Sequence, residues 1–111
     1  MAITHFKNFE MLDAEAGELL GGHELAVEGD TIREISAKPI KLPEADVVDC
    51  GSRTLMPGLI DSHVHVVLSD VVIRNLESVP LTLMTARAGH LMHKMLDRGF
   101  TSVRDTGGAA L

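Results

Sequence analysis

The sequence predicts an α/β fold in two parts, a small all-β part at residues 1–57 and a strand-helix-strand unit at residues 58–111. Two observations predict it. Residues in the first part form short β-rich runs separated by glycine, proline and acidic turn residues, which is typical of strands and hairpins. One long segment in the second part has helical periodicity, with apolar runs before and after it. Strand, helix and strand in this order predict a parallel pair of strands.

The β-rich runs of the first part are "THFKNFEML", "HELAVEGDTIREIS" and "ADVVDCGSRTLM". In the second run, Gly29 and Asp30 separate two apolar stretches, which predicts a hairpin because glycine accepts the positive φ of a tight turn. Ile32 and Ile35 are three positions apart, so a bulge or an early strand end is expected there. The two prolines of "AKPIKLPEA" confine that segment to a loop or edge, because proline cannot donate to a sheet ladder.

The helix is the most clearly marked element. Pro80 suits its first turn, where a missing N–H has no helical partner in any case. Lys94 and Arg98 lie near its end, where positive charge is favourable, and Gly99 can end it in a left-handed conformation. The segment "SDVVIRNLES" before Pro80 is expected to be a loop with a helical turn. Apolar residues at helical spacing form one stripe that is expected to be buried: Leu81, Met84, Ala88, Leu91 and Met95.

The strand before the helix, "GLIDSHVHVV", carries ionisable side chains on one face. Alternation along the strand places Asp61, His63 and His65 on the same side. We expect this face to be buried, where ionisable groups need a partner or a metal ion. Imidazoles two residues apart are separated by roughly 6.5 Å at Cα, close enough to bind one ion. Single strand histidines are more often hydrogen-bonded core or edge residues, so the pattern by itself leaves a structural role open.

Two motifs resemble those of a known superfamily. "DCGSRTLMPGLIDSHVHVV" resembles the amidohydrolase signature, in which a small β-sandwich leads through a Pro-Gly turn into a first barrel strand with His-x-His. "RGFTSVRDTGGAA" is similar to the end of helix one and strand two in the imidazolonepropionase-like branch, which includes metal-dependent dipeptidases of the prolidase and arginine-carboxypeptidase kind. The resemblance implies that residues 1–57 are a β-sandwich portion and that residues 58–111 begin a TIM (β/α)8 barrel with strand 1, helix 1 and strand 2. The barrel is incomplete in this chain, because it needs about 250 residues.

The resemblance also implies roles for individual residues. His63 and His65 correspond to metal ligands, usually of zinc, with one or two divalent ions in the complete protein; other divalent metals also suit histidine ligands. Asp61 and Asp105 match positions where a carboxylate orients an imidazole or belongs to the substrate loop, with simple capping of the backbone as the alternative. The general base is expected outside this chain, so no catalytic residue is assigned.

The implied function is hydrolysis of an amide C–N bond by a metal-activated hydroxide. Dipeptides of the Xaa-Pro or Xaa-Arg type and N-acyl amino acids are the candidate substrates. Residues 1–111 offer only part of such a site, so we expect the chain alone to be inactive. The alternative interpretation is a complete small non-catalytic binding or interaction module with structural histidines.

The composition of the chain limits the classes of binding partner that it can have. The formal net charge is -6, without a cluster of Lys and Arg, which excludes nucleic acid and anionic membranes as main partners. The N-terminus lacks a basic stretch followed by an apolar run, so a cytoplasmic protein is expected. Uncovered sheet edges and an uncovered helix face predict a homo-oligomer.

Five further residues are expected to have no functional role. Cys50 is the single cysteine and is expected to be a small packed residue. His90 and His93 lie off the apolar stripe of the helix and are expected to be solvated. His5 and His23 lie in the β-rich part, with no ligand partner nearby in the sequence.

Overall fold

The computed structural model describes residues 2–68, 70, 72, 75 and 78–107. The chain divides into two compact units, Met1–Pro57 and Gly58–Leu111. Most of the segment 69–78, which was expected to be a loop with a helical turn, lies outside the described residues. Within the described part of the chain, no helix has the length and apolar character needed to cross a membrane.

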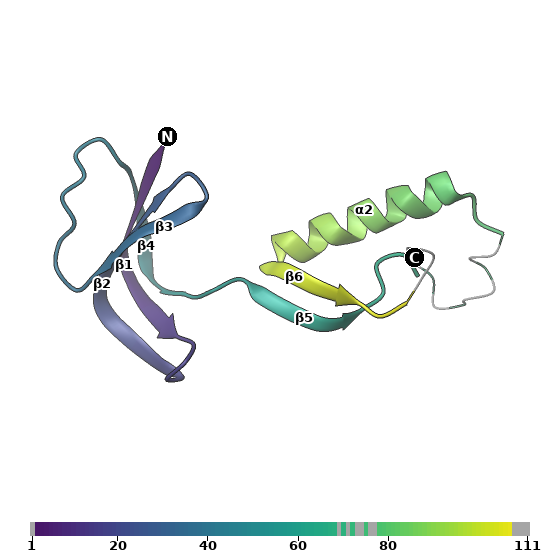
Figure 1. Ribbon diagram of the computed structural model, residues 1–111, viewed down its shortest axis with the longest axis horizontal. Coiled ribbons are helices and arrows are strands. Elements are labelled where there is room, and N and C mark those ends of the chain that lie inside the picture. Colours follow the sequence, from purple (N-terminus) through teal and green to yellow (C-terminus); the bar gives the residue numbers. More distant parts are fainter. Residues whose placement is uncertain (1, 69, 71, 73–74, 76–77, 108–111) are drawn as a thin grey trace. The chain divides into compact units, whose positions relative to one another are not determined.

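The first unit is a mixed four-stranded sheet in the order β3-β2-β1-β4 (Figure 1). β1 pairs antiparallel with β2 and parallel with β4, and β2 pairs antiparallel with β3. The predicted all-β character of this part is confirmed, although the second strand starts five residues before the run that predicted it. The strands are β1 (Ile3–Asp13), β2 (Glu18–Glu28), β3 (Thr31–Ser36) and β4 (Asp46–Leu55).

β2 and β3 form the predicted hairpin. Gly29 has a φ of 63° in the two-residue turn between them. The pairing register shifts between Ala26 and Val27, which leaves Arg33 as the extra residue of a bulge in β3. The predicted bulge is therefore confirmed, and residues 37–45 contain no strand, as the prolines predicted.

β1 and β4 have matching irregularities at one level of the sheet. Asn8 and Ser52 adopt positive φ angles of 55° and 60°, which residues other than glycine rarely do. The Ser52 hydroxyl donates to Asn8 Oδ1 at 3.0 Å, and the Asn8 amide donates to Asp49 Oδ1 at 2.8 Å. Because these bonds join residues of two strands, they stabilise both irregularities together.

The core of the first unit contains a buried histidine. His5 is 2% exposed, and its Nε2 lies 2.9 Å from Glu24 Oε2. The same oxygen accepts the Ile40 backbone N–H at 2.7 Å. No role was predicted for His5, and the structure gives it one in the core, because a buried imidazole requires a polar partner and Glu24 supplies it. The buried apolar residues around this pair are Ile3, Phe9, Leu25, Ala26 and Ile40.

The surroundings of Glu24 make the first unit sensitive to acid. Donation from the Ile40 N–H, opposed by partial burial and assisted by His5 and Lys7, holds the pKa of Glu24 below its ordinary value of 4.5. A carboxyl group with a lower pKa in the folded state contributes stability that is complete above its ordinary pKa. That contribution is lost as the pH falls through the folded-state value.

We therefore expect the free energy of unfolding to fall as the pH drops below about 4.5, and the Glu24→Gln variant to lose part of this dependence. Urea unfolding across this pH range measures both slopes. The matched control is Glu34→Gln, an exposed residue of β3, which should keep the slope of the unaltered chain. An unchanged slope in Glu24→Gln would contradict the assignment.

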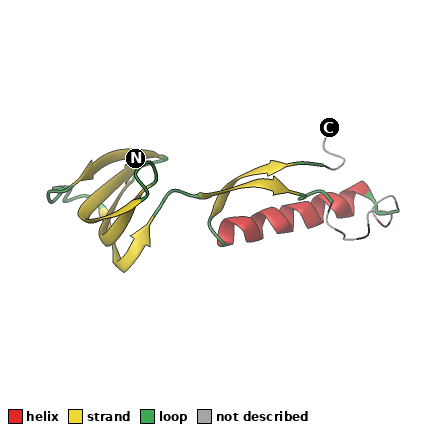
Figure 2. Ribbon diagram, turned by 90° about the horizontal axis from the view of Figure 1, so that it is seen from below, coloured by secondary structure: helices red, strands yellow, loops and turns green. Residues whose placement is uncertain are grey.

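The second unit is the predicted β-α-β unit. β5 (Leu59–Val64) and β6 (Phe100–Asp105) are parallel, and helix α2 (Leu81–Asp97) packs on one face of the pair (Figure 2). Pro80 is the N-cap residue rather than part of the first turn. Gly99 has a φ of 88° and follows the helix end, as predicted.

The apolar stripe of α2 is only partly buried. Met84 and Ala88 are buried, and Leu91 and Met95 are half-buried. Leu81 is 71% exposed, so its predicted burial is wrong. A helix of 17 residues spans about 25 Å. Strands of six residues span about 20 Å. An end turn of the helix therefore extends beyond the two strands.

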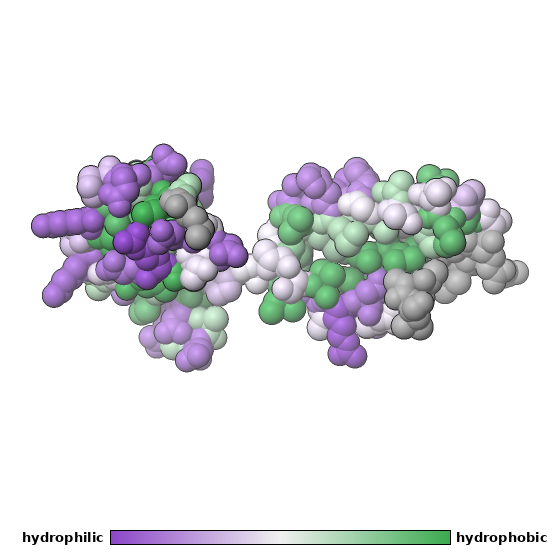
Figure 3. All heavy atoms as spheres, turned by 45° about the horizontal axis from the view of Figure 1, so that its top comes forward, coloured by the Kyte–Doolittle hydropathy of each residue, from purple (hydrophilic) through white to green (hydrophobic). Residues whose placement is uncertain are grey.

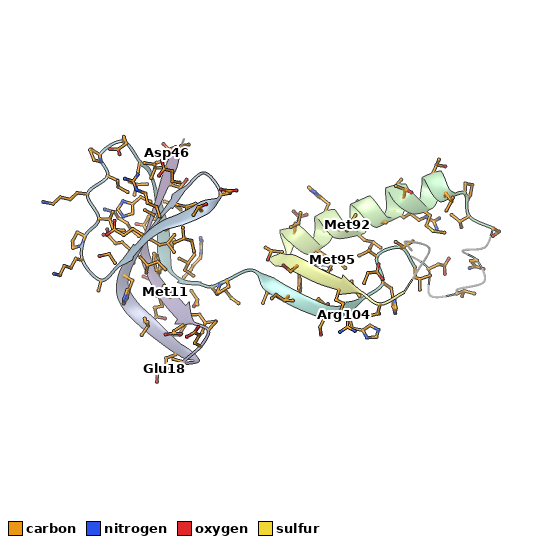
Figure 4. All side chains as sticks on the ribbon, viewed as in Figure 1. Met11, Glu18, Asp46, Met92, Met95 and Arg104 are labelled. Atoms are coloured by element: carbon orange, nitrogen blue, oxygen red, sulfur yellow. The ribbon has the colours of Figure 1, made fainter. Side chains whose placement is uncertain are left out.

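Both units expose apolar side chains (Figure 3). In the second unit, Met92 and Met95 extend from α2 beside β6 (Figure 4). Together with Leu96, Phe100, Thr101 and Val103 they line a hollow of about 180 Å³. In the first unit, apolar residues of all four strands line a second hollow of about 400 Å³. The hollow beside α2 agrees with the expectation of an uncovered helix face.

Candidate metal centre

His63 and His65 lie at the carboxyl end of β5. His63 belongs to the strand, and His65 follows its last residue, Val64. Val64 and Val66 are buried, at 6% and 7% exposed, whereas both histidines are exposed, so the imidazoles share the opposite face. The centres of the two rings are 5.2 Å apart and their planes are almost perpendicular, at 89°.

This geometry fits a shared metal ion. Two imidazoles that bind one tetrahedral zinc ion at about 2.0–2.1 Å have ring centres about 5 Å apart. No three His, Cys, Asp or Glu side chains gather as a metal-binding group in the described part of the chain. These residues therefore supply two donors, whereas a catalytic zinc site normally takes three ligands from the protein.

The expected burial of this face is wrong for the described chain. The His65 side chain is 44% exposed, and His63 is also exposed. The β5–β6 pair has α2 on one face, and the histidines are on the other face, so water can solvate them. The assignment as ligands therefore depends on the geometry of the pair and on its place at the strand end.

Asp61 caps the backbone of the site strand. Its Oδ1 accepts the backbone N–H of His63 at 3.1 Å. This is the capping role that was expected as the alternative to orienting an imidazole. The bond still affects the site, because it restrains the backbone from which the His63 side chain extends.

Asp105 is the last residue of β6, and its carboxylate accepts backbone N–H groups from the segment after β5 and from the loop after β6. Donation from the Gly107 N–H, opposed by partial burial and assisted by the N–H groups of Val66 and Val67 and by His65, holds the pKa of Asp105 below its ordinary value of 3.8. It is therefore a carboxylate at neutral pH. Its Oδ1 lies 4.0 Å from His65 Nδ1.

The histidines outside this pair have other surroundings, each within its own unit. His90 is exposed, and His93 has a side chain that is 77% exposed, as predicted for solvated residues. His23 is half-buried, and its Nδ1 lies 2.9 Å from the Gly21 carbonyl oxygen. Cys50 is a free, half-buried thiol.

The chain belongs to the amidohydrolase family. A family model with that description matches residues 54–111, which include β5, α2, β6 and both histidines. The family predicted from the two sequence motifs is therefore confirmed.

Solved structures agree with this assignment. The crystal structure of an amidohydrolase matches with a TM-score of 0.90 and 46% sequence identity, over 97% of this chain and 26% of that one. The crystal structure of a prolidase complexed with N-methylphosphonate-L-proline matches with a TM-score of 0.90 and 41% identity, over the same shares of the two chains. These matches confirm the predicted α/β fold class.

A curated relative covers less of the chain. The dihydroorotase of Geobacillus kaustophilus (strain HTA426) is 46% identical over 50 residues, which are 44% of this chain and 11% of that protein. The chain thus spans about a tenth of the length of this relative and about a quarter of the length of the solved structures.

Proposed function

We propose that this chain is the N-terminal part of a metal-dependent hydrolase that cleaves the amide bond of dipeptides, with Xaa-Pro dipeptides as the first substrate class. The single observation that carries the proposal is the 41% identity to a prolidase over 97% of the chain. The paired imidazoles at the end of β5 support it. Xaa-Arg dipeptides and N-acyl amino acids are the next candidates.

In this proposal β5, α2 and β6 begin an eight-stranded barrel, and His63 and His65 bind a divalent ion at the carboxyl ends of its strands, where such barrels have their sites. Zinc is the first candidate, because neutral imidazole nitrogen is one of its common ligands. A bound divalent ion lowers the pKa of a water molecule and polarises a substrate carbonyl. Asp61 restrains the strand that carries His63, and Asp105 lies beside His65. A general base is not assigned to residues 1–111.

The test is a substrate panel with the full-length protein, purified with and without added zinc. We expect hydrolysis of Xaa-Pro dipeptides that is lost on treatment with a chelator and restored by zinc. Dihydroorotate is included because one relative is a dihydroorotase. If the zinc-loaded protein cleaves no dipeptide and no N-acyl amino acid, the proposal is wrong.

The chain of residues 1–111 provides a second comparison. We expect it to hydrolyse none of these substrates, because its described residues offer only two metal donors. If no longer protein contains these residues and the 111-residue chain folds stably without metal, the non-catalytic module is favoured. Light scattering of the full-length protein tests the proposed homo-oligomer.

A further inference from the structure

We infer that Asp105 is a positioning residue of the metal centre, which fixes the backbone around His65 and the orientation of its ring. This inference rests on the proposed function, since it assumes that His65 is a metal ligand. The role of Asp105 is then to hold one imidazole in place before an ion binds.

The carboxylate of Asp105 joins two loops. Its Oδ2 accepts the backbone N–H of Val66, the residue directly after His65, at 3.2 Å. Its Oδ1 accepts the backbone N–H of Gly107 at 3.0 Å. One side chain therefore connects the end of β5 to the loop after β6, although Asp105 and Val66 are 39 residues apart.

The next residue of the chain completes this attachment. The Thr106 backbone N–H donates to the carbonyl oxygen of Val64 at 3.1 Å. Val64 and Val66 are the two neighbours of His65, so Asp105 and Thr106 hold the backbone on both sides of the histidine. This restrains the position of the His65 Cα even though β5 has already ended.

The ring of His65 is also placed by this loop. Its Nδ1 lies 4.0 Å from Asp105 Oδ1. A Cβ atom built on Gly107 would lie 3.6 Å from His65 Cε1 and 3.7 Å from Nδ1. The ring edge with Nδ1 and Cε1 therefore faces Asp105 and Gly107, which leaves Nε2 as the nitrogen available to an ion. A ligating imidazole usually donates its other ring N–H to a carboxylate or carbonyl. Asp105 is the carboxylate on that side of His65, at an ion-pair distance of 4.0 Å and without a direct hydrogen bond.

The test measures zinc affinity of the full-length protein by competition with a chromophoric chelator. Asp105→Asn removes the negative charge and one of the two acceptor oxygens. We expect its zinc affinity to fall by about 10–100-fold, the effect typical of lost groups that orient a ligand. Asp105→Glu keeps the charge but moves the carboxylate, so its zinc affinity should fall in the same direction. The cobalt-substituted protein provides a spectroscopic readout of the changed ligand geometry.

Asp49→Asn is the matched control. Asp49 makes the same kind of local bond, because its Oδ1 accepts the N–H of Gly51 two residues later at 2.8 Å, but it lies in the first unit. The zinc affinity of the Asp49→Asn variant should equal that of the unaltered protein. A folded Asp105→Asn or Asp105→Glu variant with unaltered zinc affinity and cobalt spectrum would overturn the inference.

Hydrogen exchange provides a measurement on the unaltered protein, for the case that neither variant folds. We expect the Val66 amide to be protected, and exchange as fast as in an open loop would overturn the inference. The proposed function fails separately. If His63→Ala and His65→Ala leave zinc binding intact, the proposed metal centre is wrong. If those two variants lose zinc affinity but the Asp105 variants do not, only the positioning role of Asp105 is rejected.

Discussion

The double variant His63→Ala, His65→Ala of the full-length protein is expected to lose zinc binding and hydrolysis together, each by about 100-fold or more, because removing two ligands costs more than the roughly 10–100-fold of removing a group that orients one. The two imidazoles lie on one face with ring centres 5.2 Å apart, so removing both deletes the paired donors of the site. Zinc content of the dialysed protein and kcat/KM on an Xaa-Pro dipeptide measure the two losses.

The helix offers a control with the same chemistry. His90 and His93 are also two histidines at close spacing, but they are exposed on α2. The variant His90→Ala, His93→Ala should retain both zinc and activity. Retention of stoichiometric zinc by the first double variant would show that the ion is bound elsewhere.

Gly58→Ala is expected to destabilise the second unit by about 1–3 kcal/mol, the range for an added methyl group that overlaps its neighbours and shifts the backbone. A Cβ atom at Gly58 would overlap the Thr101 side chain and would lie 2.7 Å from the Thr101 Cβ. That atom is attached directly to the β6 backbone, so rotation of the side chain does not relieve the overlap. The strands must separate instead.

Urea unfolding measures this loss, and Gly89→Ala is its control. Gly89 lies inside α2, and a Cβ atom there would have no other atom within 4 Å. Alanine should therefore stabilise the helix by about 0.5–1 kcal/mol. The two substitutions add the same methyl group but are expected to change the free energy of unfolding in opposite directions. Equal effects from both would show that the contact of Gly58 with Thr101 has no special cost.

Local patterns in the sequence predicted most of the elements. The two-residue turn at Gly29 and the helix end at Gly99 depend on backbone conformations that glycine adopts easily, so the residue type carries the information. The start of β2 was not predicted, because the run from Glu18 includes two glycines and no alternation. Its pairing with the end of β1 through the turn after Asp13 defines it instead.

In the site, too, local sequence patterns predicted some features, whereas contacts between residues far apart in the sequence were not predicted. Alternation along one strand placed His63 and His65 on the same face. The link between Asp105 and Val66 depends on the register of the predicted parallel pair, which aligns Val64 with Asp105 and which spacing alone does not specify. His5 was missed for a related reason, since its partner Glu24 lies 19 residues away. A local signal did exist: His5 is two positions after Ile3, on the inward face of β1.

The parallel pairing of β1 with β4 sets the order in which the first unit can form. β1, β2 and β3 are joined by short turns, so their meander closes at a small cost in chain entropy. β4 pairs with β1 between residues far apart in the sequence, such as Lys7 and Asp49. During synthesis the meander can therefore assemble before residues 46–55 leave the ribosome. Until they do, the edge of β1 that pairs with β4 has no partner strand.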